Sequence, residues 1–339
     1  MIKMRNVAGV SLLAAGALAL AGCGGSSDGE GLLTVKLTDS PVETADHVYV
    51  VFEGLEIKPV DDEAISFDFD SRREIDLLTL QDGVTESLLD GADVPVGDYE
   101  WIRLKIYAAE DTQDSSRIVV PDGAYANGQT YEAGTYPLFI PSGFQTGLKL
   151  VRPFSVAAGS TTRLVIDFDL RKSVIAPPGL APNFLLKPTL RLVDELETGT
   201  VAGDVDVAYL ADQFEVDVEA CFPAVYLFEG GEATPDDADR DSADGADPVL
   251  YETLEPNAEG IAAYVFAFVA ATRDGVDGDD YTVAFTCDGD VDAAPDESEY
   301  DPGAGEGEPG FETMAWVTED FVVVDAGETT EVNFLPEAP

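Results

Sequence analysis

Hydrophobic and polar residues alternate with a period of two along most of the chain from Leu32 onward. Short runs rich in Val, Ile, Phe, Tyr and Thr are separated by clusters of Gly, Pro, Asp and Asn. A period of two places successive side chains on opposite faces of a β-strand, and such clusters are typical of turns. Examples of the runs are HVYVVFEGLEI, YEWIRLKIY, TRLVIDFDL, AAYVFAFV and DYTVAFTC. The pattern predicts an all-β protein; one segment, residues 75–91, departs from it and is expected to be helical or irregular.

The length of 339 residues suffices for two domains with separate cores. We place the boundary near the DELETG segment, residues 194–199, and expect two tandem antiparallel β-sandwiches over residues 32–194 and 195–339. Two pairs of similar segments suggest that the halves share an architecture, although recurrent hairpin chemistry also accounts for them. These pairs are VPVGDYEWIRL with DGDDYTVAF, and FSVAAGSTTRLVIDF with VVVDAGETTEVNF.

The formal net charge is −49, from 67 acidic and 18 basic residues. Nucleic acid and anionic lipid surfaces are therefore excluded as natural partners, because like charges repel. Residues 195–339 hold 39 of the acidic residues and two arginines, Arg240 and Arg273. The second domain is thus expected to attract cations or basic partners, or to favour solubility in salt.

The first residues read MIKMRNVAGVSLLAAGALALAGC, with a basic start followed by an apolar stretch. This is the composition of a secretory signal, and it is too short for a membrane span. Leu20–Cys23 resembles the lipobox of bacterial lipoproteins, in which the cysteine is acylated after cleavage. The resemblance implies a signal peptide over residues 1–22 and a lipid anchor on Cys23; the alternative is an ordinary signal with an incidental cysteine.

Residues 23–31 then read as the lipidated cysteine and a flexible tether, GGSSDGEG. Gly24, rather than aspartate, follows the cysteine, and by resemblance to Gram-negative lipoproteins this favours the outer membrane, with its periplasmic or surface face left open. With Cys23 lipidated, Cys221 and Cys287 remain as an even pair in an oxidising compartment. They are predicted to form a disulfide, the alternative being two buried thiols.

Two pairs of acids lie on predicted strands, Asp68 with Asp70 and Asp167 with Asp169. Alternation puts each pair on one face about 6–7 Å apart, a spacing compatible with two-carboxylate glycoside hydrolysis. The opposite parity holds the apolar core residues, so the favoured interpretation is an outward acidic face. Its predicted ion-pair partners are Arg72, Arg73, Arg171 and Lys172.

The single histidine, His47, is expected to face solvent on a strand. Neither a nucleophile elbow nor a phosphate-binding glycine loop occurs in the sequence.

A calcium site is the remaining chemical hypothesis. The segment PDDADRDSADGADP places Asp237, Asp239, Asp241 and Asp244 where alternate carboxylates can converge on a hard cation. The segment departs from an EF-hand loop, with Ser242 in place of glycine and Pro248 in place of glutamate. A solvated acidic loop is the alternative.

Several segments of the first domain together resemble DUF4382, a family of β-rich domains found in bacterial lipoproteins. They include LTVKLTDSPVETADHVYVVFEGLEI, VPVGDYEWIRLKI and TGLKLVRPFSVAAGSTTRLVIDFDLRKSV, within residues 33–193. The family brings no catalytic residues with it. The second domain resembles prealbumin-like, carboxypeptidase-regulatory sandwiches through GTVAGDVDVA and DGDDYTVAFTC.

These observations predict a lipid-anchored, non-catalytic envelope protein that acts as a binding or structural module. The alternatives are a calcium-dependent adhesin or carbohydrate-binding surface protein, and a carboxylate-based hydrolase. The expected partners are the membrane, through Cys23, and a cation, a glycan or an envelope protein; no cofactor other than calcium is expected.

Overall fold

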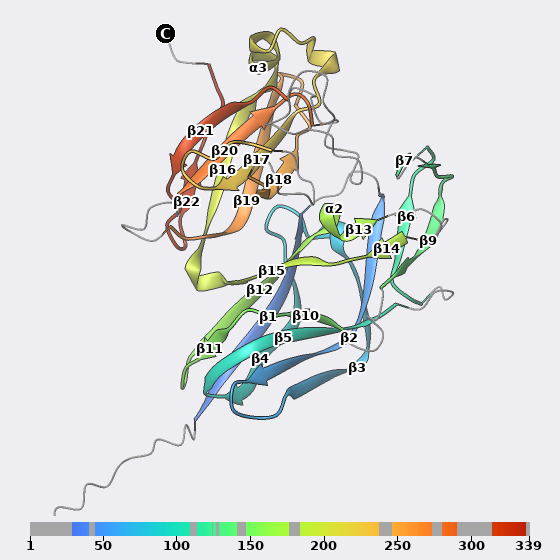
Figure 1. Cartoon of the computed structure of the whole chain (residues 1–339), viewed down its shortest axis with the longest axis vertical. Coiled ribbons are helices and arrows are strands. Elements are labelled where there is room, and N and C mark those ends of the chain that lie inside the picture. The colour runs from blue at the N-terminus through green and yellow to red at the C-terminus, as the bar shows by residue number, and fades with distance from the viewer. Residues whose placement is uncertain are drawn as a thin grey trace, which may run out of the picture.

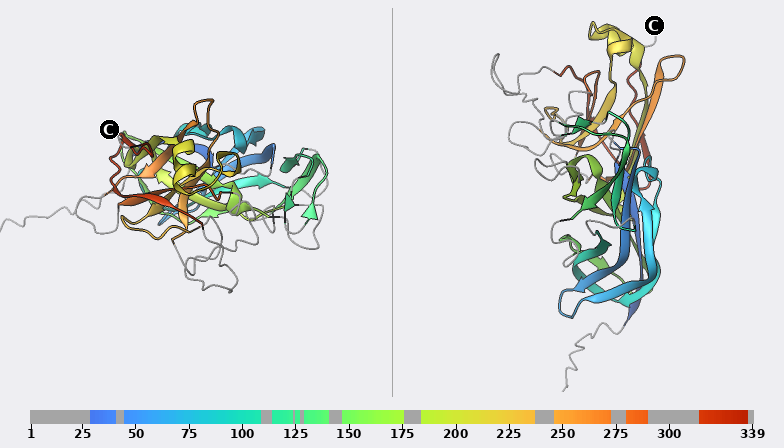
Figure 2. Two further views of the ribbon diagram at one scale, coloured as in Figure 1. Left: turned by 90° about the horizontal axis from the view of Figure 1, so that it is seen from above. Right: turned by 90° about the vertical axis from the view of Figure 1, so that its right-hand side faces the viewer.

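The structure is a computed structural model, elongated, with two β-rich domains lying one above the other along the long axis (Figures 1 and 2). It describes residues 29–40, 45–108, 114–123, 125–126, 129–140, 147–175, 184–236, 246–272, 280–289 and 314–336. The first strand starts at one end of the molecule, and helix α3 lies at the opposite end (Figure 1). Within the described residues, no helix is long and apolar enough to cross a membrane.

The first domain is a sandwich of two sheets. Its elements are β1 (Glu30–Ser40), β2 (His47–Pro59), β3 (Ile65–Asp76), η1 (Leu77–Thr79), β4 (Glu86–Pro95), β5 (Gly97–Tyr107), β6 (Arg117–Val120), β7 (Tyr125–Ala126), β8 (Gln129–Thr130), β9 (Gly134–Phe139), β10 (Leu148–Leu150), β11 (Phe154–Val156), β12 (Thr161–Asp169), α2 (Leu170–Ser173), β13 (Val174–Ile175), β14 (Phe184–Leu186) and β15 (Thr189–Asp194). One sheet has the order β15-β12-β1-β4. The other has the order β10-β5-β2-β6-β9-β14-β13, with β3 on β2 and β11 on β5, and β7 and β8 form a separate two-stranded sheet.

The second domain is a smaller sandwich. Its elements are η2 (Glu195–Glu197), β16 (Thr198–Asp206), α3 (Val207–Gln213), η3 (Val218–Ala220), β17 (Ala224–Glu229), β18 (Pro248–Thr253), β19 (Ile261–Ala270), β20 (Tyr281–Thr286), β21 (Val317–Val322) and β22 (Thr329–Glu331). Its sheets have the orders β19-β16-β22 and β18-β17-β20-β21. Each domain encloses its own apolar core.

The all-β architecture predicted from the alternation is confirmed. The pairing is not purely antiparallel, however: β1 pairs in parallel with β12, β16 with β22, and β9 with β14. In each domain the last strand of the repeat, β12 or β22, directly follows a strand of the other sheet, β11 or β21. It then pairs in parallel with the first strand of the domain, β1 or β16. Alternation within a strand cannot reveal this, because it is the same for either direction of pairing.

The two domains repeat one arrangement of seven strands. Strands β1, β2, β3, β4, β5, β11 and β12 pair with one another as β16, β17, β18, β19, β20, β21 and β22 do. Even single hydrogen bonds recur: Leu32 N–H donates to Ser160 O, and Thr200 N–H donates to Glu328 O, both at 2.9 Å. The similar Ala-Gly-x-Thr-Thr segments lead into equivalent strands, β12 and β22.

A bulge in β2 explains why the core-facing residues of this strand change from even to odd positions in the sequence. Val48, Val50 and Phe52 face the core, and after a register shift so do Leu55 and Ile57. At Gly54, between the two sets, a Cβ atom would lie 2.2 Å from the Phe67 carbonyl oxygen. Glycine permits this close approach of β3, and the bulge keeps the second set of apolar residues in the core.

Candidate functional site at the domain junction

Several of the predicted site residues lie outside the described part of the chain. These are the lipidation candidate Cys23 and the calcium candidates Asp237, Asp239, Asp241 and Asp244. In the part of the chain that the structure describes, no group of three or more His, Cys, Asp or Glu side chains could hold a metal ion. Both hypotheses therefore stay predictions.

Cys221 and Cys287 are joined by a disulfide, with 66 residues of sequence separation. The bond ties the segment after η3 to the end of β20. Phe222 N–H donates to Cys287 O at 2.7 Å, so the backbone is also held together here.

Asp68 lies on an open sheet face, where its side chain is 73% exposed. Lys105, on β5, donates a hydrogen bond to its carboxylate at 2.7 Å and lowers the pKa of Asp68. Asp70 is also exposed, while Phe67 and Phe69 point toward the core. The outward parity is as expected, but the cation is Lys105 rather than the predicted arginines: Arg72 pairs with Glu53, and Arg73 stacks on Phe69. Both acids line an open hollow of about 560 Å³ on this face, together with Arg73 and Asp90.

The interpretation of Asp167 as an outward residue is wrong, since it is 5% exposed and pairs with Arg191 of β15 at 2.8 Å. Strand β12 lies inside its sheet, and the second domain covers this end of it, so both faces of the strand are buried here. Asp169 caps α2 by accepting from Lys172 N–H at 3.0 Å. The side chain of Arg171 lies outside the described residues.

His47 lies on β2 with its side chain 48% exposed, and its Nδ1 is 2.6 Å from the Asp76 carboxylate. The solvent-facing position agrees with the sequence-based expectation.

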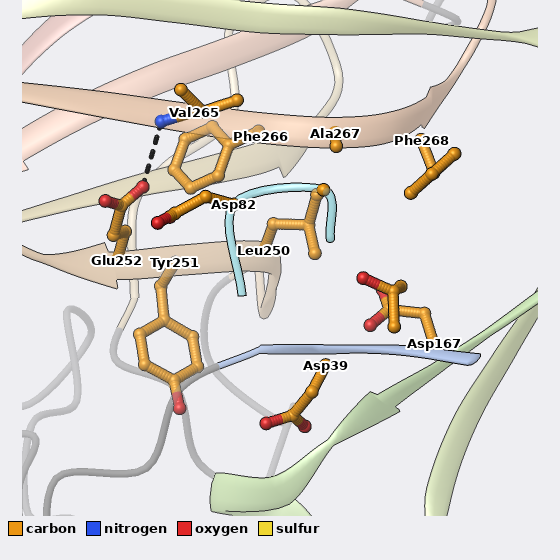
Figure 3. Close-up of a pocket in the computed structure, with 12 residues that line it drawn as sticks. Asp39, Asp82, Asp167, Leu250, Tyr251, Glu252, Val265, Phe266, Ala267 and Phe268 are labelled. Carbon is orange, nitrogen blue, oxygen red and sulfur yellow. Dashed lines mark hydrogen bonds between the residues drawn. The ribbon is translucent and has the colours of Figure 1, made fainter. Parts of the chain in front are cut away.

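A small cavity of about 30 Å³ lies where the two domains meet (Figure 3). Its walls come from β1, β12 and the turn after η1 in the first domain, and from β18 and β19 in the second. The lining residues are Thr38, Asp39, Asp82, Gly83, Asp167, Leu250, Tyr251, Glu252, Val265, Phe266, Ala267 and Phe268. Four of them are acidic, and two of these, Asp39 and Asp167, are buried, which is unusual for carboxyl groups.

The first domain contributes a tight turn, Gln81–Val84. Val84 N–H donates to Gln81 O at 3.0 Å, and both central residues have positive φ, 55° at Asp82 and 77° at Gly83. A type I′ turn requires this conformation, and Asp-Gly is a preferred sequence for it. Thr38 Oγ1 lies 3.0 Å from Leu80 O and 3.1 Å from Val84 O, so its hydroxyl fixes the turn to β1.

The second domain receives this turn at a β-bulge in β19. Ala267 and Phe268 together oppose one residue of β16, and Phe268 has a φ of 55°. A Cβ atom added at Gly83 would lie 2.8 Å from the Cβ of Ala267. The turn and the bulge therefore meet with no room for a side chain at this point.

Glu252 is the most perturbed carboxyl group of the junction. It is half-buried on β18, and its carboxylate accepts the Val265 N–H of β19 at 2.9 Å (Figure 3). The pKa of Glu252 is raised to about 7: burial is the largest cause, the Val265 hydrogen bond lowers the pKa, and the charge of Asp82 makes a smaller contribution that raises it. The group therefore changes its protonation state near neutral pH.

Sequence reasoning missed this site. The Asp-Gly pair at residues 82–83 is a turn signal, but it lies in the segment expected to be helical or irregular. Nothing in the local pattern around Glu252 distinguishes it from the other acids of the second domain. Its neighbours Val265 and Asp82 come from other elements, and the fold alone brings them together.

Residues 30–188 match the family described as "Domain of unknown function (DUF4382)". The first domain is thus a DUF4382 domain, as the resemblance indicated, whereas the prealbumin-like resemblance of the second domain stays a prediction. No curated protein matches the chain.

Solved structures give weak similarities. A "putative adhesin" from Bacteroides ovatus has 11% identity, 91% coverage of this chain, 94% coverage of its own and a TM-score of 0.22. A "putative cell adhesion protein" from Bacteroides eggerthii has 12% identity, coverages of 90% and 86%, and a TM-score of 0.20. This chain spans 26% of a leucine-rich repeat protein from Bacteroides thetaiotaomicron, with 90% of this chain covered, 12% identity and a TM-score of 0.19. Such TM-scores are too low to carry an argument about this chain.

Proposed function

We propose that the chain is a lipid-anchored, non-catalytic protein of the bacterial outer membrane that holds an acidic binding or structural domain away from the bilayer. The observation that carries the proposal is the position of the first strand. Strand β1 begins at Glu30 at one end of the molecule, and the second domain lies beyond its other end (Figure 1). An anchor just before β1 would thus leave the second domain distal.

The length of the tether limits how far the first domain can lie from the bilayer. Six residues separate Cys23 from Glu30. Fully extended, they reach about 24 Å including the bond to Glu30. The end of the first domain would therefore stay close to the headgroups, and the domain with 39 acidic residues would face the medium or a partner.

Anchoring is tested by metabolic labelling with an alkyne fatty acid and by membrane fractionation. The wild-type chain is expected to incorporate the label and to fractionate with the outer membrane. Cys23→Ser should lose the label and become soluble, whereas Gly24→Asp should keep the label and move to the inner membrane. Labelling that persists in Cys23→Ser contradicts the proposal.

Orientation is tested with a fluorophore on one introduced cysteine and an acceptor in the bilayer. Asp93→Cys lies near the start of β1, since Asp93 pairs with Leu32. Glu259→Cys lies at the far end, where Gly260 O accepts from Val207 N–H at the start of α3. Strong energy transfer is expected from position 93 and weak transfer from position 259. Equal transfer would show that the molecule lies flat and would contradict the distal placement.

A further inference from the structure

The sheet edges formed by β10 with β11, and by β21, carry a bulge at equivalent positions in the two repeats. Residues 151–153, between β10 and β11, lie opposite residues 100–101 of β5, and residues 319–321 of β21 lie opposite residues 282–283 of β20. The pairs on either side of the bulges are Leu150 with Ile102 and Phe154 with Tyr99 in the first domain, and Thr318 with Ala284 and Val322 with Tyr281 in the second. A bulge at a sheet edge redirects side chains, and all the residues of both bulges are exposed.

The two bulges both expose an apolar side chain, but they differ in charge. Val151 is 74% exposed and Phe321 is 58% exposed. Arg152 occupies the central position of the first bulge, and Asp320 occupies the same position of the second. Within the described part of the chain, neither residue forms an ion pair, although the chain has 67 acidic residues for 18 basic ones. The equivalent positions therefore present opposite charges that are free to pair with another molecule.

Phe321 is held in an outward position before any partner binds. Its N–H donates to Gly231 O at 2.9 Å, and its backbone has a φ of 57°. A Cβ atom at Gly231 would lie 2.5 Å from the Phe321 ring, so the ring rests directly on the glycine. An aromatic side chain that is ordered in advance loses little entropy on binding, and such side chains are common at the centres of interfaces.

The first bulge stands between two hollows in the surface of the first domain. One hollow, of about 360 Å³, is lined by Lys149, Arg152 and Arg191 together with aliphatic side chains, and its lining includes no acidic residue. The other, of about 610 Å³, is lined by aromatic and aliphatic side chains and two acids. Lys149 and Val151 line both hollows. An aliphatic floor with cations at its rim fits an aromatic ring beside a carboxylate, which is what the second bulge presents.

The position of the bulges allows two copies of the chain to make this contact twice. Strands β11 and β21 both lie on the left side of the elongated molecule in Figure 1. A two-fold axis midway between the bulges and perpendicular to the long axis exchanges their positions. A second copy generated by this axis runs antiparallel to the first, and each copy brings its acidic bulge to the basic bulge of the other. Such an interface is closed, and the two contacts reinforce each other.

We infer that this side of the molecule is an interface between two antiparallel copies of the chain, in which Arg152 of each copy pairs with Asp320 of the other and Phe321 enters the basic hollow. The pairing goes beyond the proposed function and does not require the anchor. For anchored copies it would join molecules on two facing membranes, and this consequence alone rests on the proposed function.

The net charge of −49 opposes the pairing at long range. The repulsion is screened beyond about 8 Å at an ionic strength of about 0.15 M, whereas at about 0.01 M it extends to about 30 Å. The contact between the bulges is short-range and partly apolar, so it persists when the repulsion is screened. Dimerisation is therefore expected to strengthen as salt rises between these two concentrations, the opposite of a complex held by ion pairs alone.

The test is sedimentation velocity of the purified chain carrying Cys23→Ser, at an ionic strength of about 0.15 M. The chain is expected to show a monomer–dimer equilibrium. Arg152→Asp and Asp320→Arg should each weaken dimerisation by about tenfold or more, because like charges then face each other at both contacts. A mixture of these two variants should form a heterodimer as readily as the wild type dimerises, since both of its contacts again join opposite charges.

Two exposed residues away from the bulges supply matched controls. Arg163→Asp on β12, which lines neither hollow, and Asp212→Arg on α3 make the same changes of charge. Neither should weaken dimerisation by more than about twofold. Asp320→Arg reduces the net negative charge, so general repulsion predicts stronger association for this variant, and the interface predicts weaker association. A chain that stays monomeric at every concentration, or a mixture of Arg152→Asp with Asp320→Arg that fails to associate, overturns the inference.

Discussion

At the residue scale, the burial of Glu252 changes the pH at which its carboxyl group loses its proton. Most of the acids in the described part of the second domain are exposed, yet Glu252 lies between β18, β19 and a turn of the other domain. Its pKa of about 7 lies above the ordinary value of 4.5, and burial is the main cause. Between these two values the folded protein retains a proton that the unfolded chain has already released.

Stability should therefore fall as the pH rises through this window. For Glu252 the free energy of unfolding is expected to decrease by up to about 3 kcal/mol between pH 4.5 and 7. Urea unfolding of the wild type and Glu252→Gln at several pH values measures the difference. The difference should widen in favour of Glu252→Gln as the pH rises, and a constant difference would show that Glu252 titrates normally.

At the element scale, the parallel pairs of each domain depend on equivalent glycines. Gly31 of β1 lies where a Cβ atom would be 2.6 Å from Ala157 O, and Gly199 of β16 where it would be 2.4 Å from Asp325 O. Both contacts are with the backbone just before the turn that leads into the parallel strand. The same requirement at the same place in both repeats explains why a glycine stands near the start of each domain.

Gly31→Ala and Gly199→Ala are each expected to destabilise their own domain by about 1–3 kcal/mol, because the backbone must move apart. Gly134→Ala is the control, since its Cβ atom would meet the Tyr136 ring at an ordinary 3.4 Å. Chemical denaturation followed by hydrogen exchange assigns the loss to one domain. Unchanged stability of both variants would contradict the close approach.

The disulfide between Cys221 and Cys287 links two elements of the second domain. It closes a loop of 66 residues within the second domain, and on the chain-entropy model it contributes about 4 kcal/mol. Cys221→Ala/Cys287→Ala should lower the unfolding midpoint of the second domain and leave that of the first unchanged. Calorimetry that resolves the two transitions measures both, and an equal fall in both would show that the domains do not unfold separately.

At the scale of the whole molecule, charge is distributed unevenly between two related sandwiches. The second domain carries 39 acidic residues against two arginines. If Asp237, Asp239 and Asp241 bind calcium, millimolar calcium should raise the melting temperature more than sodium chloride of matched ionic strength. The triple alanine variant should remove that excess; equal stabilisation by sodium would assign the acidity to salt tolerance.

The sequence correctly predicted the features that depend only on the alternation of residues within one strand. The outward parity of Asp68 and Asp70 and the exposure of His47 follow from alternation within one strand. It failed at Asp167, because the cover over that face of β12 comes from a domain that begins about 30 residues later. The junction could not be found for the same reason: the turn at Asp82 and the carboxyl of Glu252 are separated by 170 residues and meet only after both domains have folded.

The pairing of β1 on both sides also determines how the first domain responds to a pulling force. A pull on the residues before Glu30 would act along β1, which is bonded on one side to β12 over nine residues and on the other side to β4. Such a pull loads both ladders in shear, so many hydrogen bonds must fail together rather than one after another. A tethered molecule whose far domain is gripped by a partner would therefore resist tension at the strand where tension enters.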